Sequence, residues 1–150
     1  MRVFRLTKRK YAGVLNGKGA AKSNNRWNSK GTEMIYTAES RALAMAEVVV
    51  HLSMDMLPDD FVMMEIDIPE NVRVEEVVDF ECGTYLWPPN HETQKLGDGF
   101  VRAEECAVLK VPSMVVNGDF NFLINPAHSD FEEISVVDVV DFPFDARLFQ

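Results

Sequence analysis

With 150 residues, 47% of them hydrophobic, the chain has the size of one ordinary domain and enough apolar side chains for a core, so we expect a single domain over residues 1–150. It has no apolar run of about 18 residues and no signal-peptide pattern, which indicates a cytoplasmic protein that does not span a membrane. The net charge of −9 argues against a general nucleic-acid-binding protein, and the two cysteines, Cys82 and Cys106, lack the spacing of a disulfide framework or a metal site.

The first predicted strand, MRVFRL at residues 1–6, opens a basic segment. Residues 1–30 hold nine Lys or Arg and no Asp or Glu, whereas residues 31–150 hold six basic and 24 acidic residues. Such a segment can be an arm for nucleic acid, a solvated edge or a pocket for a small anion. The loop LNGKGAAKSNN at residues 15–25 is rich in glycine and amide side chains, and its backbone N–H groups and lysines suit a phosphate better than a duplex.

The elements after this loop mix strands and helices without regular alternation. A short strand at 33–38 precedes a predicted helix at 40–54, which is rich in Ala, Leu and Met and has Ser40 as its N-cap. Residues 93–104 predict a weak helix broken by two glycines. Further strands are predicted at 61–68, 72–78, 107–113, 121–126 and 134–142. Because strands outnumber helices, the sequence predicts an α+β fold.

Glu47 stands out because apolar residues, Leu43 and Val50, lie one turn away from it on the predicted helix. Two interpretations remain open. An ordinary polar stripe on one side of the helix would consist of Ala44, Glu47, His51 and Asp55. A carboxylate tucked against a cleft wall would instead stabilise positive charge or accept a proton.

Arg26 and Ser113 are the other two candidates. The guanidinium of Arg26 can grip a phosphate or carboxylate with two hydrogen bonds, or it can be a surface group whose stem lies on Trp27. Ser113, in VPSMVV, can orient a substrate hydroxyl or amide, although a serine after a proline at a strand end more often satisfies its own turn.

Taken together and in order, these motifs resemble a known family. NRWNSKGTEMIYTAESRALAMAEVVVHL at residues 25–52 is similar to the core signature of the RES domain, the toxin of bacterial RES–Xre toxin–antitoxin pairs. The resemblance also takes in LNGKGA, the LPDDFVMMEIDIPE and TQKLGDGFVRAEECAVLKVPSMVV segments, FLINPAHSDF and the closing FPFDARL. It therefore covers almost the whole chain.

The resemblance implies a fold and an activity. The fold would be like that of ADP-ribosyltransferases, a compact α+β domain with a split central sheet and flanking helices around a cleft for NAD. The activity would be consumption of NAD+, which is the substrate, by cleavage of the nicotinamide–ribose bond. Water as acceptor would make a glycohydrolase and phosphate a phosphorylase, and these two are favoured because no feature of the sequence would dock a protein substrate. A protein side chain as acceptor would make an ADP-ribosyltransferase.

By motif, the arginine, glutamate and serine of the family's name fall on Arg26, Glu47 and Ser113, and a strand tyrosine of the family falls on Tyr36. The resemblance implies that Arg26 binds the diphosphate, Glu47 the ribose and Tyr36 the nicotinamide end, while Ser113 orients nicotinamide or ribose. No metal is required, because nicotinamide leaves as a neutral molecule. We expect catalytic roles for Glu47, Arg26, Tyr36 and Ser113, and NAD contacts from Arg26, Trp27, Tyr36, Lys18, Ser113 and Asn125.

Two positions of the signature stay open. Many relatives have glycines before the RWN arginine, where this chain has Asn24 and Asn25, so the loop here is expected to be stiffer or to approach the ligand differently. His128, in INPAH, can be a base that activates water, but a structural turn is favoured because the bond being broken needs little base assistance.

The resemblance also implies a partner, an Xre-type helix-turn-helix antitoxin that blocks the cleft in a hetero-oligomeric complex. The acidic body of the chain is compatible with a basic partner. A rival from another class is a nucleic-acid-binding module or ribonuclease toxin that uses the basic segment. The charge of −9 and the lack of a nucleic-acid fold signature argue against direct nucleic-acid binding by this chain.

Overall fold

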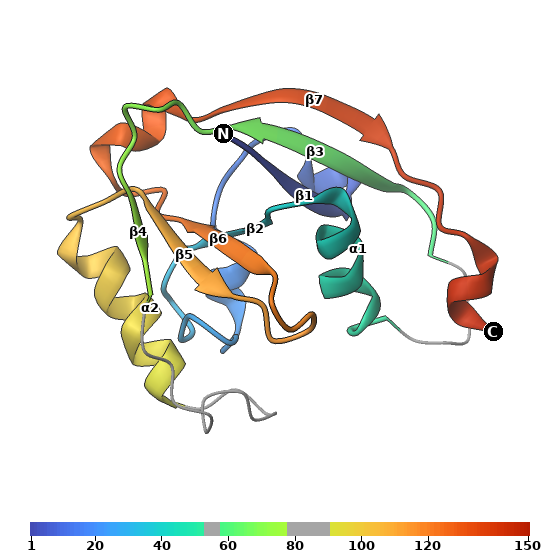
Figure 1. Ribbon diagram of the computed structural model, residues 1–150, viewed down its shortest axis with the longest axis horizontal. Coiled ribbons are helices and arrows are strands. Elements are labelled where there is room, and N and C mark those ends of the chain that lie inside the picture. The colour runs from blue at the N-terminus through green and yellow to red at the C-terminus, as the bar shows by residue number, and fades with distance from the viewer. Residues whose placement is uncertain (53–57, 78–90) are drawn as a thin grey trace.

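The computed structural model describes residues 1–52, 58–77 and 91–150, which form one seven-stranded mixed sheet with two α-helices (Figure 1). The strand order is β4-β5-β6-β2-β1-β3-β7. The strands are β1 (Arg2–Lys8), β2 (Ile35–Ala38), β3 (Phe61–Asp67), β4 (Val74–Glu76), β5 (Val108–Pro112), β6 (Phe120–Ile124) and β7 (Ser135–Asp141). The helices are α1 (Arg41–Val49) and α2 (His91–Ala103). This confirms the predicted α+β class.

The pairing of the strands shows where the sheet is narrowest. Only β4 and β5 run parallel among the described strands, and β1 pairs with β3 over seven positions. By contrast, the register between β1 and β2 consists of one pair, Phe4 with Ala38. The sheet is therefore continuous. In place of the split that was expected, it has a narrow junction between β1 and β2.

The alternation of side chains gives the sheet two buried faces. On one face the core contains Val3, Ile35, Met64, Phe122 and Ile124. On the other face, α1 covers one end and the segment around Trp27 covers the other. The α1 end contains Phe4, Leu6, Ala38, Leu43 and Met63, and the Trp27 end contains Met34, Leu109, Val111 and Leu123. Between these two clusters the same face carries polar side chains.

Helix α1 begins where the sequence predicts it and ends earlier. The Ser40 side chain accepts a hydrogen bond from the backbone N–H of Leu43 at 3.1 Å, which confirms the N-cap. The helix ends at Val49 rather than continuing to residue 54, and residues 53 and 54 lie outside the described residues. A run of β-branched valines lowers helix propensity at this end, and the chain leaves the helix through tighter turns, with the N–H of His51 bonded to the carbonyl of Val48.

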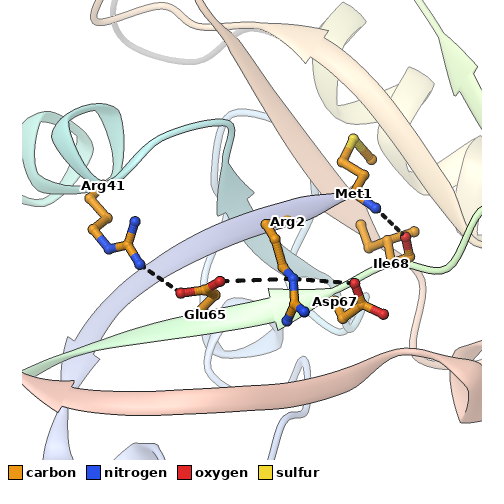
Figure 2. A network of polar contacts seen from close by, with 6 residues as sticks. All are labelled: Met1, Arg2, Arg41, Glu65, Asp67 and Ile68. Carbon is orange, nitrogen blue, oxygen red and sulfur yellow. Dashed lines mark hydrogen bonds and ion pairs between the residues drawn. The ribbon is translucent and has the colours of Figure 1, made fainter.

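Arg41, at the start of α1, ties the helix to the sheet (Figure 2). Its guanidinium contacts Glu65 of β3 at 2.6 Å and stacks over the ring of Phe4 at 4.4 Å. Arg2 of β1 lies between Glu65 and Asp67, at 3.8 and 3.4 Å. Because these charges are partly exposed, each pair contributes at most about 1 kcal/mol, and the Arg41–Glu65 pair joins the start of α1 to β3.

Helix α2 differs from its prediction. It runs without a break from His91 to Ala103, through both glycines that were expected to interrupt it. Gly97 is needed for packing, because a Cβ at this position would lie 1.7 Å from the carbonyl oxygen of Trp27. Nothing lies within 4 Å of the Cβ position of Gly99. Tertiary contact therefore outweighs the low helix propensity of glycine here.

The remaining strand predictions hold, with shorter boundaries. The strand expected at 72–78 is reduced to Val74–Glu76, and residue 78 lies outside the described part of the chain. The strands expected at 61–68, 107–113, 121–126 and 134–142 are β3, β5, β6 and β7. In Figure 1, α1 lies beside β1 and β2, and α2 lies at the other end of the sheet beside β4 and β5.

Candidate active site

Three side chains meet on the sheet face between the two clusters. The carboxylate oxygen Oε1 of Glu47, on the last turn of α1, accepts hydrogen bonds from Ser113 Oγ at 2.8 Å and from Asn121 Nδ2 at 2.6 Å. Ser113 follows the last residue of β5, and Asn121 lies near the start of β6. Both bonds end on Oε1, and none that ends on Oε2 is formed by the described residues. The carboxylate is anchored by one oxygen.

The position of Glu47 decides between its two interpretations. Leu43 and Ala44, one turn earlier on α1, are buried at 1% and 4% exposure, and Glu47 itself is half-buried against β5 and β6. His51 is exposed, and Asp55 lies outside the described residues. The polar stripe is therefore wrong for Glu47, which points onto the sheet rather than into solvent.

Ser113 satisfies its own turn and also bonds to Glu47, whereas a contact with substrate stays a prediction. Its hydroxyl oxygen accepts hydrogen bonds from the backbone N–H groups of Val115 and Val116, at 3.1 and 3.0 Å, and so organises its own turn. The same hydroxyl donates to Glu47. The side chain is buried at 2% exposure. Ser113 thus fixes the carboxylate relative to a rigid turn.

Arg26 lies in a loop whose backbone carbonyls accept hydrogen bonds from side chains of α2. The hydroxyl of Thr93 donates to the carbonyl of Arg26 at 2.5 Å, and the amide of Gln94 donates to the carbonyl of Asn25 at 2.9 Å. Thr93 and Gln94 are buried. Because both bonds grip the main chain, the helix sets the position of Arg26 through contacts that do not involve its guanidinium.

A second pair of contacts closes the same loop on α2. The backbone N–H and the hydroxyl of Ser29 donate to the carboxylate of Asp98 at 3.0 and 2.5 Å. Burial acts to raise the pKa of Asp98, but the hydrogen bonds from Ser29 and Thr32 and the charge of Arg102 together lower it more, so this carboxylate is ionised at neutral pH and holds the loop. Together with the close contact of Gly97 and Trp27, this makes one face of α2 the support of residues 25–29.

Electrostatics connect Arg26 to Glu47. Burial lowers the pKa of Arg26 from its ordinary value, while the negative charge of Glu47 acts in the opposite direction. Arg26 remains a cation at neutral pH. The site thus places a partly desolvated guanidinium within the field of an anchored carboxylate, which suits a ligand that carries both an anionic and an electron-poor part.

Tyr36 links the sheet to the RWN loop. Its hydroxyl donates to Asn28 Oδ1 at 2.7 Å and accepts from the backbone N–H of Trp27 at 3.1 Å. Burial raises the pKa of Tyr36 above its ordinary value, so the hydroxyl stays protonated. Trp27 is 2% exposed and packs in the core with Leu123, which leaves its predicted contact with NAD a prediction.

The two asparagines that replace glycines brace this loop. The amide of Asn25 donates to the carbonyls of Ala20 and Ser23 at 3.0 and 3.2 Å, and the side chain of Asn24 accepts from the N–H of Lys30 at 2.9 Å. Asn28, fully buried, adds a bond to the same carbonyl of Ala20 at 2.9 Å. These contacts brace the loop at both asparagines, and whether it is stiffer or approaches the ligand differently stays a prediction.

Three predicted residues are not brought to this cluster. Lys18 is exposed on the glycine-rich loop, where its N–H bonds to Asn16. Asn125 is fully buried at the other end of β6, with its amide donating to Val101 and its Oδ1 accepting from Ala127. Their NAD contacts stay predictions. His128 accepts from the N–H of Asp130 at 3.0 Å and caps a 3₁₀ turn at Ser129–Glu133, which is the structural role favoured for it.

Asn121 is the site residue that the sequence did not indicate. It lies in a strand that looks like an ordinary apolar segment, NFLINP. The available signal was an amide side chain inside a strand on the same face as Leu123, because an unpaired amide there must find a buried partner. Its partner, Glu47, is 74 residues away in the sequence, so local pattern could not identify the pair.

Other features lie apart from this cluster. A groove of about 380 Å³ between α2 and the β4–β5 pair is lined by Glu75, Leu96, Phe100 and Cys106 among others, and by none of the predicted site residues. Burial raises the pKa of Cys106 to about 11; Cys82 lies outside the described residues. Over residues 1–52, 58–77 and 91–150, no three His, Cys, Asp or Glu side chains are grouped to hold a metal ion. No helix of these residues is long and apolar enough to cross a membrane.

Comparisons with known proteins give a consistent result. The family model described as RES domain matches residues 2–145. "Prs ADP-ribosylating toxin" of Sphingobium sp. (strain YBL2) is 34% identical over 140 residues, which cover 91% of this chain and 87% of the relative. "Toxin Res" of Photorhabdus laumondii is 35% identical over 153 residues, covering 99% of this chain and 97% of the relative.

A solved structure shares the fold. The crystal structure of the M. tuberculosis MbcT-MbcA toxin-antitoxin complex contains a chain that superposes with a TM-score of 0.73 at 18% sequence identity, covering 99% of this chain and 86% of that one. At this identity the likeness establishes the architecture alone.

Proposed function

The chain belongs to the RES domain family, and on that premise we propose that it is a toxin that consumes NAD+ by cleaving the nicotinamide–ribose bond. Water or phosphate accepts the ADP-ribosyl group, and a cognate antitoxin silences the enzyme. The observation that carries this proposal is Glu47, a carboxylate anchored through Oε1 by Ser113 and Asn121 in the field of Arg26.

Glu47 supplies what the bond cleavage demands. As nicotinamide leaves, the ribose gains oxocarbenium character, and a carboxylate beside the sugar stabilises this transition state more than the ground state. With Oε1 held by two donors, Oε2 is the oxygen that reaches a ribose hydroxyl. Anchoring lowers the reorganisation needed during the reaction, which is how preorganised groups accelerate it. Ser113, which bonds to Glu47, is a positioning residue in this scheme.

Arg26 and the basic segment take the other half of the substrate. The diphosphate of NAD+ is a dianion, and Arg26 can hold it with two hydrogen bonds. Lys18 adds positive charge on the neighbouring glycine-rich loop. The absence of acidic residues in residues 1–30 keeps this region attractive to phosphate within an acidic protein. Tyr36, which is half-buried beside this loop, packs against the nicotinamide end, where an aromatic face suits a flat cationic ring.

The comparisons support the toxin assignment and its partner. Several relatives at about one-third identity are named "Toxin Res", and the fold neighbour comes from a toxin-antitoxin complex. We therefore propose an antitoxin partner that covers this site, of the Xre helix-turn-helix type implied by the motif resemblance. Expression of the chain in bacteria should stop growth and deplete cellular NAD, and co-expression of the antitoxin should prevent both.

A second candidate function rests on the name of one relative, "Prs ADP-ribosylating toxin". If this chain transfers ADP-ribose to a protein, incubation with labelled NAD in a cell extract will label a discrete protein band. A glycohydrolase gives free ADP-ribose instead, and a phosphorylase gives ADP-ribose 1″-phosphate only when phosphate is present. Product analysis by mass spectrometry thus distinguishes the three acceptors.

A further inference from the structure

Asn121 carries a polar atom without a partner. Its Oδ1 is buried and forms no hydrogen bond in the structure, while its Nδ2 donates to Glu47 Oε1 at 2.6 Å. Among the described residues, it is the one buried side-chain oxygen or nitrogen without a hydrogen bond. Burying an acceptor without a donor costs free energy, and native proteins keep such atoms chiefly where a water or a ligand completes them.

The orientation of the amide is fixed by its neighbour. If the amide were turned over, Oδ1 would face a carboxylate oxygen at 2.6 Å, and two acceptors would repel each other. Oδ1 is therefore directed away from Glu47 Oε1. The residues paired with Asn121 on the adjacent strands are Ala38 of β2 and Val111 of β5, and neither side chain has a donor to offer. Neither neighbour can satisfy Oδ1, which leaves a water or a ligand hydroxyl as its donor.

We propose that Asn121 is a substrate-binding residue whose Oδ1 accepts a hydrogen bond from one hydroxyl of the nicotinamide ribose, beside the hydroxyl held by Glu47. The inference rests on the proposed function. Its chemical basis is that the side chains of Asn121 and Glu47 are bonded to each other, and each keeps one oxygen, Oδ1 and Oε2, that accepts no hydrogen bond from the described residues. A ribose presents two hydroxyl donors on adjacent carbons, which is the group that such a pair of acceptors fits.

Asn121 would thus have two separable effects. Through Nδ2 it holds Glu47, and through Oδ1 it binds the sugar. The first effect is independent of the substrate, whereas the second disappears when the substrate lacks the hydroxyl in question. A site built to bond a hydroxyl discriminates strongly against an analogue without it, because the buried acceptor is again left unpaired.

The test compares the effect of one substitution, Asn121→Ala, on three substrates. Nicotinamide release is measured in single turnovers, with enzyme in excess, for wild type and Asn121→Ala on NAD and on its two analogues that lack either hydroxyl of the nicotinamide ribose. On NAD we expect Asn121→Ala to be slower by on the order of 10²-fold. On one analogue this ratio should fall by about tenfold, to the part that comes from anchoring Glu47, and on the other it should persist.

Two further variants serve as controls. Asn117→Ala removes an exposed asparagine from the turn between β5 and β6 and should leave release unchanged. Asn121→Asp keeps an acceptor and the volume but replaces the donor to Glu47 by a second carboxylate, so it shows the combined effect of lost anchoring and added negative charge. Thermal unfolding of each variant verifies that it is folded.

Each outcome has one meaning. A ratio that falls by about tenfold on one analogue alone supports the proposal. A ratio of about 10² that persists on both analogues means that Asn121 acts only through Glu47, and a ratio near unity on NAD means that it does not act at all; either result overturns the inference while NAD cleavage stands. If wild type releases no nicotinamide from NAD, the proposed function itself has failed, and the inference falls with it.

Discussion

The hydroxyl of Tyr36 joins two residues of the RWN loop and shows how the arginine of that motif is held. It bonds the side chain of Asn28 and the backbone of Trp27, the two residues that follow Arg26. Asn28 is fully buried and Trp27 nearly so. In the RWN motif the tryptophan and the asparagine thus build the loop, and in the proposed function the arginine faces the ligand.

Replacing Tyr36 by phenylalanine tests this arrangement. The variant leaves a buried acceptor on Asn28 and a backbone donor on Trp27 without their bonds, so we expect unfolding to require about 1–3 kcal/mol less free energy. Tyr11→Phe, at an exposed tyrosine, should change stability by less than about 0.5 kcal/mol. Urea unfolding measures both. Equal stabilities of the two variants would contradict the role given to Tyr36.

The difference in stability between wild type and Tyr36→Phe should depend on pH, and the pKa shift of Tyr36 gives the direction of the change. Burial raises the pKa of Tyr36 in the folded state above its ordinary value of 10.0, so the unfolded chain loses this proton first as the pH rises. The stability that depends on the protonated hydroxyl is fully present below pH 10 and declines above it. The gap in stability between wild type and Tyr36→Phe should therefore narrow between pH 10 and the highest pH at which the protein remains folded.

At the level of single residues, the sequence predicted some members of the cluster and missed others. A carboxylate between apolar residues identified Glu47, and the RWN motif identified Arg26, because each is chemically unusual where it stands. Asn121 could not be identified, since its importance comes from a contact with Glu47 across 74 residues. Tyr36 was assigned to the ligand, whereas the direction of its hydroxyl toward the loop depends on how the strand and the loop pack.

Helix α2 is the element on which the site depends most. It contributes no predicted catalytic residue, yet Thr93, Gln94, Gly97 and Asp98 all contact residues 25–29. A helix is a rigid support, and sites supported in this way hold their geometry more closely than sites on loops alone.

Gly97→Ala tests this support, with Gly99→Ala as the matched control on the same helix. A Cβ added at Gly97 would overlap the carbonyl of Trp27, so helix and loop must separate; we expect a loss of about 2–3 kcal/mol and a fall in NAD cleavage. Gly99 faces open space, so alanine there should stabilise the protein by about 0.5–1 kcal/mol through helix propensity. Thermal and urea unfolding measure both changes. Variants that behave alike would show that the close contact at Gly97 does not matter.

Elements were predicted well where a single pattern dominated. Strands β3, β5, β6 and β7 follow from their apolar runs, and α1 begins at Ser40 as its capping side chain indicates. The errors in the predicted helices lie where tertiary packing decides whether the helix continues. Glycines suggested a broken helix at 93–104, but one of them is the contact that allows α2 to approach Trp27. The early end of α1 reflects its run of β-branched valines, which lower helix propensity.

Over the whole molecule, charge separates the basic segment, residues 1–30, from the rest of the chain. All nine charged side chains in the first 30 residues are Lys or Arg, and the other 120 residues carry a net charge of −18. The composition alone could not distinguish a nucleic-acid arm from a phosphate site. The structure places Arg26 of this segment in the field of Glu47, on a sheet face that bears a few converging polar groups. Such a site suits a small ligand with a diphosphate better than a polymer.

This charge distribution predicts weak binding to nucleic acids. Fluorescence anisotropy with labelled single-stranded RNA and duplex DNA at low salt should show no saturation at protein concentrations of about 10 μM, because residues 31–150 carry a net charge of −18 that repels nucleic acid. Tight binding that falls steeply as salt is added would contradict this expectation and would favour the rival nucleic-acid function.

The architecture itself was predictable to the level of class and family. An α+β fold follows from the order of strands and one clear helix, and the seven-stranded sheet with its narrow β1–β2 junction required the three-dimensional register. That junction lies at Ala38, two residues before the cap of α1, and so sets where Glu47 meets β6.

The most direct measurement of the central claim is nicotinamide release from NAD by the purified, antitoxin-free chain beside Glu47→Gln. Glutamine keeps the size of the side chain but removes its charge, so we predict a rate lower by on the order of 10²- to 10³-fold in a variant that unfolds at nearly the same temperature. Release by wild type that depends on Glu47 would establish the carboxylate as the group that stabilises the ribose. A Glu47→Gln variant that keeps more than about half of the wild-type rate would contradict this role, because losing one essential electrostatic group should cost far more than twofold.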